Sequence, residues 1–475
     1  MDRRQFLYGA ASAAFSSSRT IVDQPAVSMQ LTLPVTNPRL MPVDFTGLSH
    51  EAGQLYNPEF FSQHNVPLVN AFRGLSGKGV LRLGGHLSNI TPWEGVGQDD
   101  PKQQRGVRHG IEDYWEWPLV DPAVQQNKRG ILTRKAINNL CGFLDAVDWR
   151  LIYGLNFACG SAARAADEAE AVTALIGDRL VAFVVGNEAD GFGEDQFFRA
   201  KGYDFNQYFG EYETWVKAVR KRVPNARFAG PDTDGKVDTW VMEYARRTRG
   251  DAVLLTSHFY GMGPANDSRM TAERLLRKVN TELDSQIADV QAASAAAGGT
   301  PYRMDEGNSC FGGGREGVSN AYASALWVAN YMLRVACAGF AGVNLHGGGV
   351  GIYTPIESSV KAPASPRPVY YGMQFAQMFA GWEVAPCVLD TNANVTAYVG
   401  TKGEQVMLAV INKGANTVRL KLPDRFRPEK VTYRSELSGP GLNAKDGVNF
   451  GRVQLPDERA ISEVKGYSAM ILQVG

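Results

Sequence analysis

Cysteine is scarce in this sequence, and the few cysteines are poorly spaced for cross-linking. The chain has 475 residues and five cysteines, an odd number with no close-spaced pair. This pattern argues against a disulfide-stabilised scaffold and against a zinc ribbon. The five are Cys141, Cys159, Cys310, Cys337 and Cys387.

An excess of either charge is also missing, since 49 Lys and Arg residues balance 49 Asp and Glu residues. Nucleic acids and anionic membrane surfaces both favour a basic partner, so we expect neither. Hydrophobic residues make up 44% and charged residues 21%, which is typical of a globular protein rather than a disordered one. The length predicts more than one ordinary domain. No obligate protein partner is evident.

Long apolar runs are absent. A membrane-spanning helix needs about 18 uninterrupted apolar residues, and the nearest approach, residues 322–345, contains Asn330, Arg334 and Asn344. Near the start, Arg3-Arg4-Gln5-Phe6-Leu7 precedes a short, mildly apolar segment rich in small residues. This resembles a bacterial twin-arginine export signal. We therefore set residues 1–25 aside and expect a periplasmic or secreted protein.

Nucleotide-binding glycine motifs are incomplete. Gly349-Val350-Gly351 is followed by Ile352, Tyr353 and Thr354, so the last glycine of the dinucleotide fingerprint is missing. Before Gly77-Lys78, Phe72 stands where a phosphate-binding loop needs its first glycine. The sequence thus disfavours a doubly wound nucleotide-binding sheet.

What the sequence does contain is an alternation of β-rich runs and helix-periodic stretches, which predicts a parallel sheet with crossover helices. Eight such units favour a (β/α)₈ barrel with enlarged loops. The expected helices include 133–147, 205–223, 237–249, 270–297 and 319–338. The expected strands are 43–49, 79–84, 150–156, 180–187, 226–232, 252–259, 301–306 and 342–346.

After Gly381 the pattern becomes one of short strands separated by turn residues, with no obvious helix, which predicts an antiparallel β-sandwich. Its expected strands are 395–399, 405–412, 417–422, 430–437 and 468–474. We divide the chain into a signal segment 1–25, a strand-bearing segment 26–40 that joins the sandwich, a barrel 41–380 and a sandwich 381–475.

Two glutamates follow buried strands that should end at the barrel mouth. Glu188 closes the fourth predicted strand, and Glu306 closes the seventh. A buried carboxylate needs either a charged or hydrogen-bonding partner or a catalytic role. A single such glutamate could therefore equally well have a structural role, in a salt bridge or beside a helix N-cap. Two of them favour a carboxylate pair across the mouth. Such pairs hydrolyse glycosides with retention at about 5–5.5 Å separation and with inversion at about 6.5–9.5 Å.

Four histidines, His50, His86, His258 and His346, also fall at predicted strand ends. None has metal-ligand spacing, so we expect no metal, and we expect no other cofactor. One such histidine is usually a structural hydrogen-bonding group. Four at the same rim favour contacts to substrate hydroxyls.

Asn187-Glu188 and Glu306, at the ends of strands four and seven, resemble the clan of retaining glycosidases with (β/α)₈ barrels. Within that clan the chain is similar to glycoside hydrolase family 79, the β-glucuronidases and heparanases, especially its bacterial β-glucuronidases. The resemblance runs from about residue 28 to the C-terminus and is carried by residues 81–85, 185–188, 257–260, 304–308 and 347–353.

The resemblance implies roles. Glu188 would be the acid/base, Glu306 the nucleophile and Asn187 the partner of the sugar 2-hydroxyl. His258 and Tyr260 would lie beside the nucleophile, with Tyr260 holding Glu306 ionised. The glucuronate carboxylate would be bound by Gly351 and the other amides of 347–351 and by the Tyr353 hydroxyl. Apart from the resemblance, His346 is a candidate contact to a substrate hydroxyl as one of the four strand-end histidines.

The loop of residues 86–130 is rich in aromatic residues, which are either core or sugar-packing surfaces. Asp113 in this loop is a candidate hydroxyl ligand.

A heparanase-like endo-enzyme binds a sulfated polysaccharide and needs Lys and Arg residues clustered along its cleft. The basic residues of this chain are scattered, so they fit such an enzyme poorly. We therefore expect an exo-β-glucuronidase that acts on a glucuronic-acid-containing glycan or glucuronide. The alternatives are the endo-enzyme, a related retaining glycosidase for a neutral sugar, and a glycan-binding protein that has lost catalysis. A lyase or aldolase would need a Schiff-base lysine or metal cluster at a strand end, and the sequence shows neither.

Overall fold

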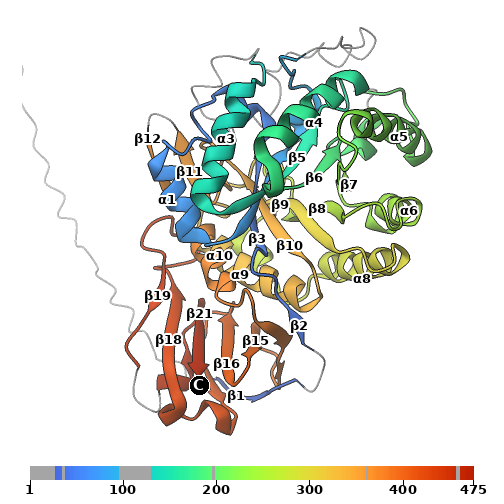
Figure 1. Ribbon diagram of the computed structural model, residues 1–475. Helices are drawn as coiled ribbons and strands as arrows, with labels where there is room; N and C mark the ends of the chain where they lie inside the picture. Colours follow the sequence, from blue (N-terminus) through green and yellow to red (C-terminus); the bar gives the residue numbers. More distant parts are fainter. Residues whose placement is uncertain (1–26, 35–37, 96–129, 195–197, 360–361, 456–459) are drawn as a thin grey trace, which may run out of the picture.

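The computed structural model contains a closed eight-stranded parallel barrel and a two-sheet β-sandwich (Figure 1), so the predicted fold class is confirmed. It describes residues 27–34, 38–95, 130–194, 198–359, 362–455 and 460–475. The signal segment, Asp113 and most of the aromatic loop lie outside these residues. Within them, no helix has the length and apolar character that a bilayer crossing requires.

All eight predicted barrel strands are present, with bounds that differ by a few residues. β10 pairs in parallel with β3 and closes the barrel. The strands are β3 (Thr46–Glu51), β4 (Gly79–Gly84), β5 (Trp149–Leu155), β6 (Leu180–Val185), β7 (Phe228–Thr233), β8 (Leu254–Met262), β9 (Tyr302–Cys310) and β10 (Gly342–Gly347).

A helix follows each barrel strand. Side chains cap several of them: Thr133, Ser161 and Asn280 each accept a hydrogen bond from the backbone N–H three residues on. The helices are α1 (Val66–Leu75), α3 (Arg134–Val147), α4 (Ala162–Ile176), α5 (Phe205–Arg222), α6 (Met242–Arg247), α7 (Ala272–Leu275), α8 (Thr281–Ala296), α9 (Tyr322–Cys337) and α10 (Pro368–Gln377). The single helix expected over 270–297 is therefore two, α7 and α8.

The sandwich lies below the barrel in Figure 1. Its seven-stranded sheet has the order β19-β18-β21-β16-β15-β13-β2 and its four-stranded sheet the order β14-β1-β17-β20. The strands are β1 (Val27–Thr32), β2 (Arg39–Leu40), β13 (Glu383–Pro386), β14 (Val388–Leu389), β15 (Val395–Lys402), β16 (Gln405–Asn412), β17 (Val418–Lys421), β18 (Val431–Ser438), β19 (Asn449–Arg452), β20 (Glu463–Val464) and β21 (Ser468–Val474). A separate hairpin joins β11 (Ile356–Ser359) and β12 (Ala362–Pro366).

β1 from the start of the described chain lies between β14 and β17. It runs parallel to β17, so this sheet is not purely antiparallel.

The two parts share a core. Alternate residues of β16 face opposite ways, as a pleated strand requires: Val406, Leu408 and Val410 pack inside the sandwich. Met407, Ala409 and Ile411 join the large cluster that surrounds the barrel. The Tyr322 hydroxyl of α9 also donates to the carbonyl oxygens of Leu437 and Tyr467. The sandwich therefore covers the flank of the barrel formed by α9 and α10.

Candidate active site

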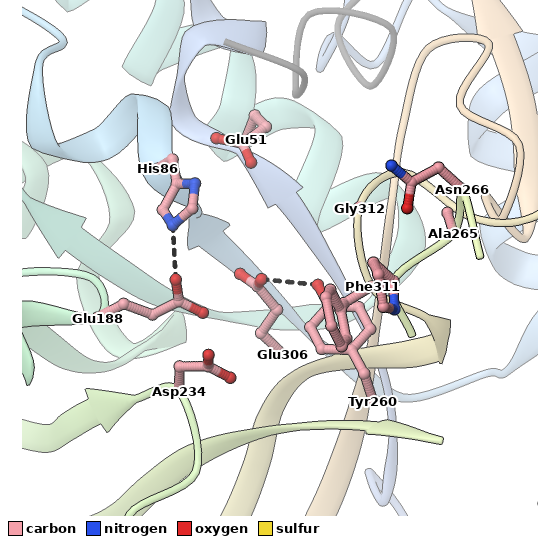
Figure 2. A pocket seen from close by; sticks show the side chains of 11 residues that line it. Glu51, His86, Glu188, Asp234, Tyr260, Ala265, Asn266, Glu306, Phe311 and Gly312 are labelled. Carbon is pink, nitrogen blue, oxygen red and sulfur yellow. Dashed lines mark hydrogen bonds and ion pairs between the residues drawn. The ribbon is translucent and has the colours of Figure 1, made fainter. Parts of the chain in front are cut away.

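The two predicted catalytic glutamates face each other in a pocket of about 410 Å³ (Figure 2). Glu306 belongs to β9, whereas Glu188 follows β6. One carboxylate oxygen of each, together with His258 Nδ1, lie within 4.8 Å of one another. The pocket is lined by Glu51, His86, Glu188, Asp234, Tyr260, Pro264, Ala265, Asn266, Glu306, Phe311 and Gly312.

The backbone at Glu188 is held in an unusual conformation. Its φ angle is 50°, in the left-handed region that non-glycine residues rarely occupy. Its N–H donates to the carbonyl of Asp232, 2.8 Å away, which ties the turn after β6 to β7. Asp232 itself has a φ angle of 62°. Strain of this kind persists where surrounding contacts fix it, and it is concentrated at functional sites.

Glu306 is surrounded by hydrogen-bond donors. The Tyr260 hydroxyl donates to Oε1 over 2.9 Å, and the Arg82 guanidinium donates to Oε2. Burial alone would raise the pKa of Glu306, but the nearby His346, His258 and Arg82 lower it overall. The ionised form is therefore favoured, which is the form a nucleophile needs.

Glu188 is held between two imidazoles. His86 Nε2 lies 2.5 Å from Oε2, and His258 Nδ1 lies 2.6 Å from Oε1. Burial raises the pKa of Glu188, but His86 and His258 outweigh burial and hold that pKa well below its usual range. A general acid usually has a raised pKa and its partner nucleophile a lowered one. Here the pKa values of both carboxyls are lowered, so the two carboxyls alone do not provide this contrast. Because the three groups share protons, they titrate as a cluster.

A fully buried arginine organises the floor of the site. Arg82, only 1% exposed, projects from β4 and forms ion pairs with Asp232 and Glu306. It also donates to the side-chain oxygen of Asn187 over 2.6 Å. Since Arg82 takes that oxygen, the Asn187 side-chain nitrogen is the remaining donor, and it has no hydrogen-bond partner among the described residues.

Two carboxylates extend this network. His258 Nε2 lies 3.2 Å from Asp232, so His258 links Asp232 to Glu188. Burial lowers the pKa of His258, but Glu306 and Asp232 raise it well above its usual value. Burial, together with the charge of Asp232, raises the pKa of Asp305 well above its usual range. The protonated form of Asp305 is therefore favoured, while Arg82 and His258 compensate part of the negative charge of Asp232 and the two catalytic glutamates.

Within the part of the chain that the structure describes, two triads could in principle hold a metal ion: Glu188, His258 and Glu306, and Asp232, His258 and Asp305. In both, the Arg82 guanidinium already pairs with a carboxylate of the set. The Arg82 guanidinium therefore already supplies, next to these residues, the positive charge that a metal ion would bring.

The remaining sequence predictions fall at varying distances from this centre. His346 contacts Ser49 and Glu51 and lies 3.5 Å from Glu306, so it belongs to the surroundings of the catalytic carboxylate. His50 does not join the site: its ring packs against Phe61 and Phe72 behind the barrel wall, and burial lowers its pKa to about 3.

In the loop predicted to bind the glucuronate carboxylate, two backbone amides already donate hydrogen bonds within the loop. The amide of Gly348 donates to the Thr354 hydroxyl, and the amide of Gly351 donates to the carbonyl of Gly348. The Tyr353 side chain is fully buried, with its ring centroid 6.2 Å from that of Tyr260 and 6.0 Å from that of His346.

Sequence reasoning gave no role to Arg82, Asp232, Asp305, Glu51 or Asp234. A recognisable signal existed for Arg82, which is a lone charge inside the apolar strand Gly79–Gly84. Such a residue cannot lie in a barrel core without a partner.

Comparisons with known proteins concern the chain as a whole. No protein-family model matches the chain. A β-glucuronidase of Aspergillus niger is 23% identical over 434 residues, which cover 83% of this chain and 75% of that protein. A β-glucuronidase of Neurospora crassa is 24% identical over 397 residues, which cover 76% of this chain and 66% of that protein.

Among solved structures, a 4-O-α-L-rhamnosyl-β-D-glucuronidase from Fusarium oxysporum 12S matches at a TM-score of 0.70 and 17% identity. The match covers 94% of this chain and 100% of that one, and shows a shared fold. Together with the sequence relatives, it identifies the chain as a glycoside hydrolase.

Proposed function

We propose that this glycoside hydrolase is an exo-acting, retaining β-glucuronidase of glycoside hydrolase family 79. The observation that carries the mechanism is the closeness of the two carboxylates, whose nearest oxygens lie within 4.8 Å. Retaining enzymes need about 5–5.5 Å between carboxyl groups, whereas inverting enzymes need about 6.5–9.5 Å for an intervening water. The substrate assignment is supported by the sequence relatives named β-glucuronidase.

In the first step, a Glu306 oxygen attacks the anomeric carbon of the bound glucuronide while the glycosidic oxygen leaves with a proton from Glu188. The products are the free aglycone and a glucuronyl ester of Glu306. In the second step, Glu188 takes a proton from water, the water oxygen attacks the anomeric carbon, and Glu306 is released as carboxylate. Each residue thus ends in its starting state.

The surrounding residues support these roles. Arg82 and Tyr260 hold Glu306 in place through donated hydrogen bonds. The side-chain nitrogen of Asn187 is available to donate to the sugar 2-hydroxyl, because Arg82 fixes the amide orientation. His86 and His258 contact the two oxygens of Glu188, so an imidazolium at either position can return a proton to Glu188.

Retention is tested by proton NMR of an aryl β-glucuronide during early turnover. The first-formed product should be β-glucuronic acid, and an initial α-anomer would disprove the double displacement. Among nitrophenyl glycosides, the glucuronide should be hydrolysed fastest; a faster arabinoside or glucoside would disprove the substrate assignment.

The roles are tested with two variants. Glu188→Ala should lose about 10²–10⁴-fold on poor leaving groups, which need protonation, and much less on an activated aryl glucuronide. Azide should restore its turnover and yield β-glucuronyl azide. Glu306→Ala should lose activity on every substrate, so equal behaviour of the two variants would contradict the assignment.

We further propose that Tyr353 and the 347–351 loop read the glucuronate carboxylate. Tyr353 lies against Tyr260, which itself contacts the nucleophile. A charge-assisted hydrogen bond contributes roughly 1.5–3 kcal/mol, so Tyr353→Phe should lower kcat/KM for the glucuronide about tenfold to a hundredfold. The matched aryl glucoside should hardly change. Equal losses on both substrates would assign Tyr353 to packing alone.

We also propose that the protein is exported through the twin-arginine route. The basis is the N-terminal sequence Arg3-Arg4-Gln5-Phe6-Leu7. Changing both arginines to lysine should leave the protein in the cytoplasm of a bacterial host. Unchanged export in cell fractionation would exclude this route.

A further inference from the structure

A second pocket, of about 330 Å³, lies where the barrel meets the sandwich. The segment between α7 and α8 contributes Arg277 and Lys278, and α9 contributes Arg334. From the sandwich come Tyr398 of β15 and Lys413, which directly follows β16. This pocket shares no lining residue with the catalytic pocket.

The lining is basic. Arg277, Lys278, Arg334 and Lys413 contribute to it, and no Asp or Glu appears among the described residues that line it. Arg277 pairs with Glu282, and Arg334 pairs with Asp284, both from α8. Their charges are therefore partly balanced from outside the pocket.

Lys413 is not balanced in this way. It is only 5% exposed, yet among the described residues no carboxylate pairs with its ammonium and no acceptor takes a hydrogen bond from it. The charged groups nearest to it, Arg334 and Lys278, have the same sign. A buried cation among cations is unfavourable unless an anion joins it.

The walls are held by hydrogen bonds between barrel and sandwich. The side-chain oxygen of Asn330 on α9 accepts from Thr396 over 2.6 Å and from Tyr398 over 2.9 Å. Its N–H groups therefore remain as donors, and Asn330 also lines the pocket. Across the opening, Lys278 Nζ donates to the carbonyl of Thr391 over 3.2 Å. The donors are thus arranged before any ligand arrives.

We propose that this pocket binds an oxyanion, held by Lys413 and assisted by Arg334, Lys278 and Asn330. Sulfate, phosphate and carboxylate groups share the required chemistry, because each presents several acceptor oxygens to clustered cations. The ligand is either a free inorganic anion or an acidic group on a carbohydrate. Because the pocket is formed by both parts of the chain, an anion bound there stabilises their association.

The test is isothermal titration calorimetry of the full chain with sodium sulfate, sodium phosphate and sodium D-glucuronate in low-chloride buffer. Lys413→Met should weaken binding at this site at least about tenfold. Lys430→Met is the matched control, since Lys430 is exposed in the sandwich, and it should bind as the wild type does. Lys413-dependent binding of sulfate or phosphate alone indicates an inorganic ligand; Lys413-dependent binding of glucuronate indicates a carbohydrate acid.

A second measurement needs no variant. Burial, with Arg334 and Lys278 nearby, lowers the pKa of Lys413 to about 8. Anion affinity should therefore fall as pH rises from about 7 to about 9, where the ammonium loses its proton. The other titratable lining groups stay protonated in this range, because burial raises the pKa of the Cys337 thiol to about 12 and raises the pKa of the Tyr331 and Tyr398 phenols further. No binding by the wild type, or equal binding by Lys413→Met, would overturn the proposal.

Discussion

At the scale of single residues, the catalytic centre depends on charges that compensate one another in and beneath the pocket. Glu188 has an imidazole on each of its two oxygens, and Glu306 has an arginine on one and a tyrosine on the other. Removing one cation should therefore change how its carboxylate neighbours titrate as well as how they are positioned.

His86→Gln should move the pH profile of kcat/KM in a defined direction. His86 lowers the pKa of Glu188, so its loss should raise that pKa. If Glu188 supplies the proton to the leaving group, activity is lost as pH rises through its pKa, and the alkaline limb should shift to higher pH. His64→Gln, at an exposed histidine, is the control. A shift to lower pH would mean that an imidazolium is the proton donor.

Arg82→Met should cost about 3–5 kcal/mol of stability near neutral pH, because it leaves buried carboxylates without their cation. In the wild type, Arg82 lowers the pKa of Asp232 and Glu306, so these groups contribute stability above their usual pKa that is lost as pH falls. In the variant their pKa values rise, and its deficit should shrink as the solution is acidified.

Chemical denaturation of Arg82→Met across a pH series checks this. Arg303→Met is a matched comparison: Arg303 is also buried, but it donates to Asn344 and to backbone carbonyls. Its stability loss should be nearly independent of pH. Equal pH dependence in both variants would contradict the role assigned to Arg82.

At the scale of elements, the barrel strands were predictable because each is an apolar run ended by a polar or glycine cluster. α4 was not singled out, since Asp167 and Glu168 make its buried face look polar. Each of these carboxylates has a hydrogen-bond partner outside the helix: Asp167 accepts from the Trp93 indole, and Glu168 accepts from the Tyr153 hydroxyl. Pairing of this kind arises between elements distant in sequence and leaves no periodic trace. The partners of Arg82 were missed for the same reason, although Arg82 itself stands out as a lone charge in an apolar strand.

β1 offers an element-scale prediction. Leu31 is 1% exposed in the sandwich core. Leu31→Ala should cost about 2–5 kcal/mol, because it leaves a cavity where two sheets meet. Gln30→Ala, at the exposed neighbour on the same strand, should change stability by less than about 0.5 kcal/mol. Urea unfolding would measure both, and similar values would show that β1 contributes little to the core.

At the scale of the whole molecule, 49 positive and 49 negative side chains leave no net charge to attract an anionic substrate from a distance. We therefore expect kcat/KM for an aryl glucuronide to change less than about threefold between roughly 20 and 200 mM salt. A matched aryl glucoside serves as the uncharged reference. A steep fall for the glucuronide alone would show that long-range attraction drives its capture.

The position of β1 also has a consequence for biosynthesis. Its parallel partner β17 is made about 390 residues later, so a ribosome adding roughly 5–20 residues per second needs tens of seconds to supply it. Its other neighbour, β14 (Val388–Leu389), is also made late and is only two residues long, so Met29 and Leu31 have no complete sheet to enter before β17 is made. Nascent chains arrested before residue 418 should be cut by protease within residues 27–34, whereas released chains should resist. The N-terminal strand β1 therefore stays incompletely paired and accessible to protease until the ribosome has synthesised β17.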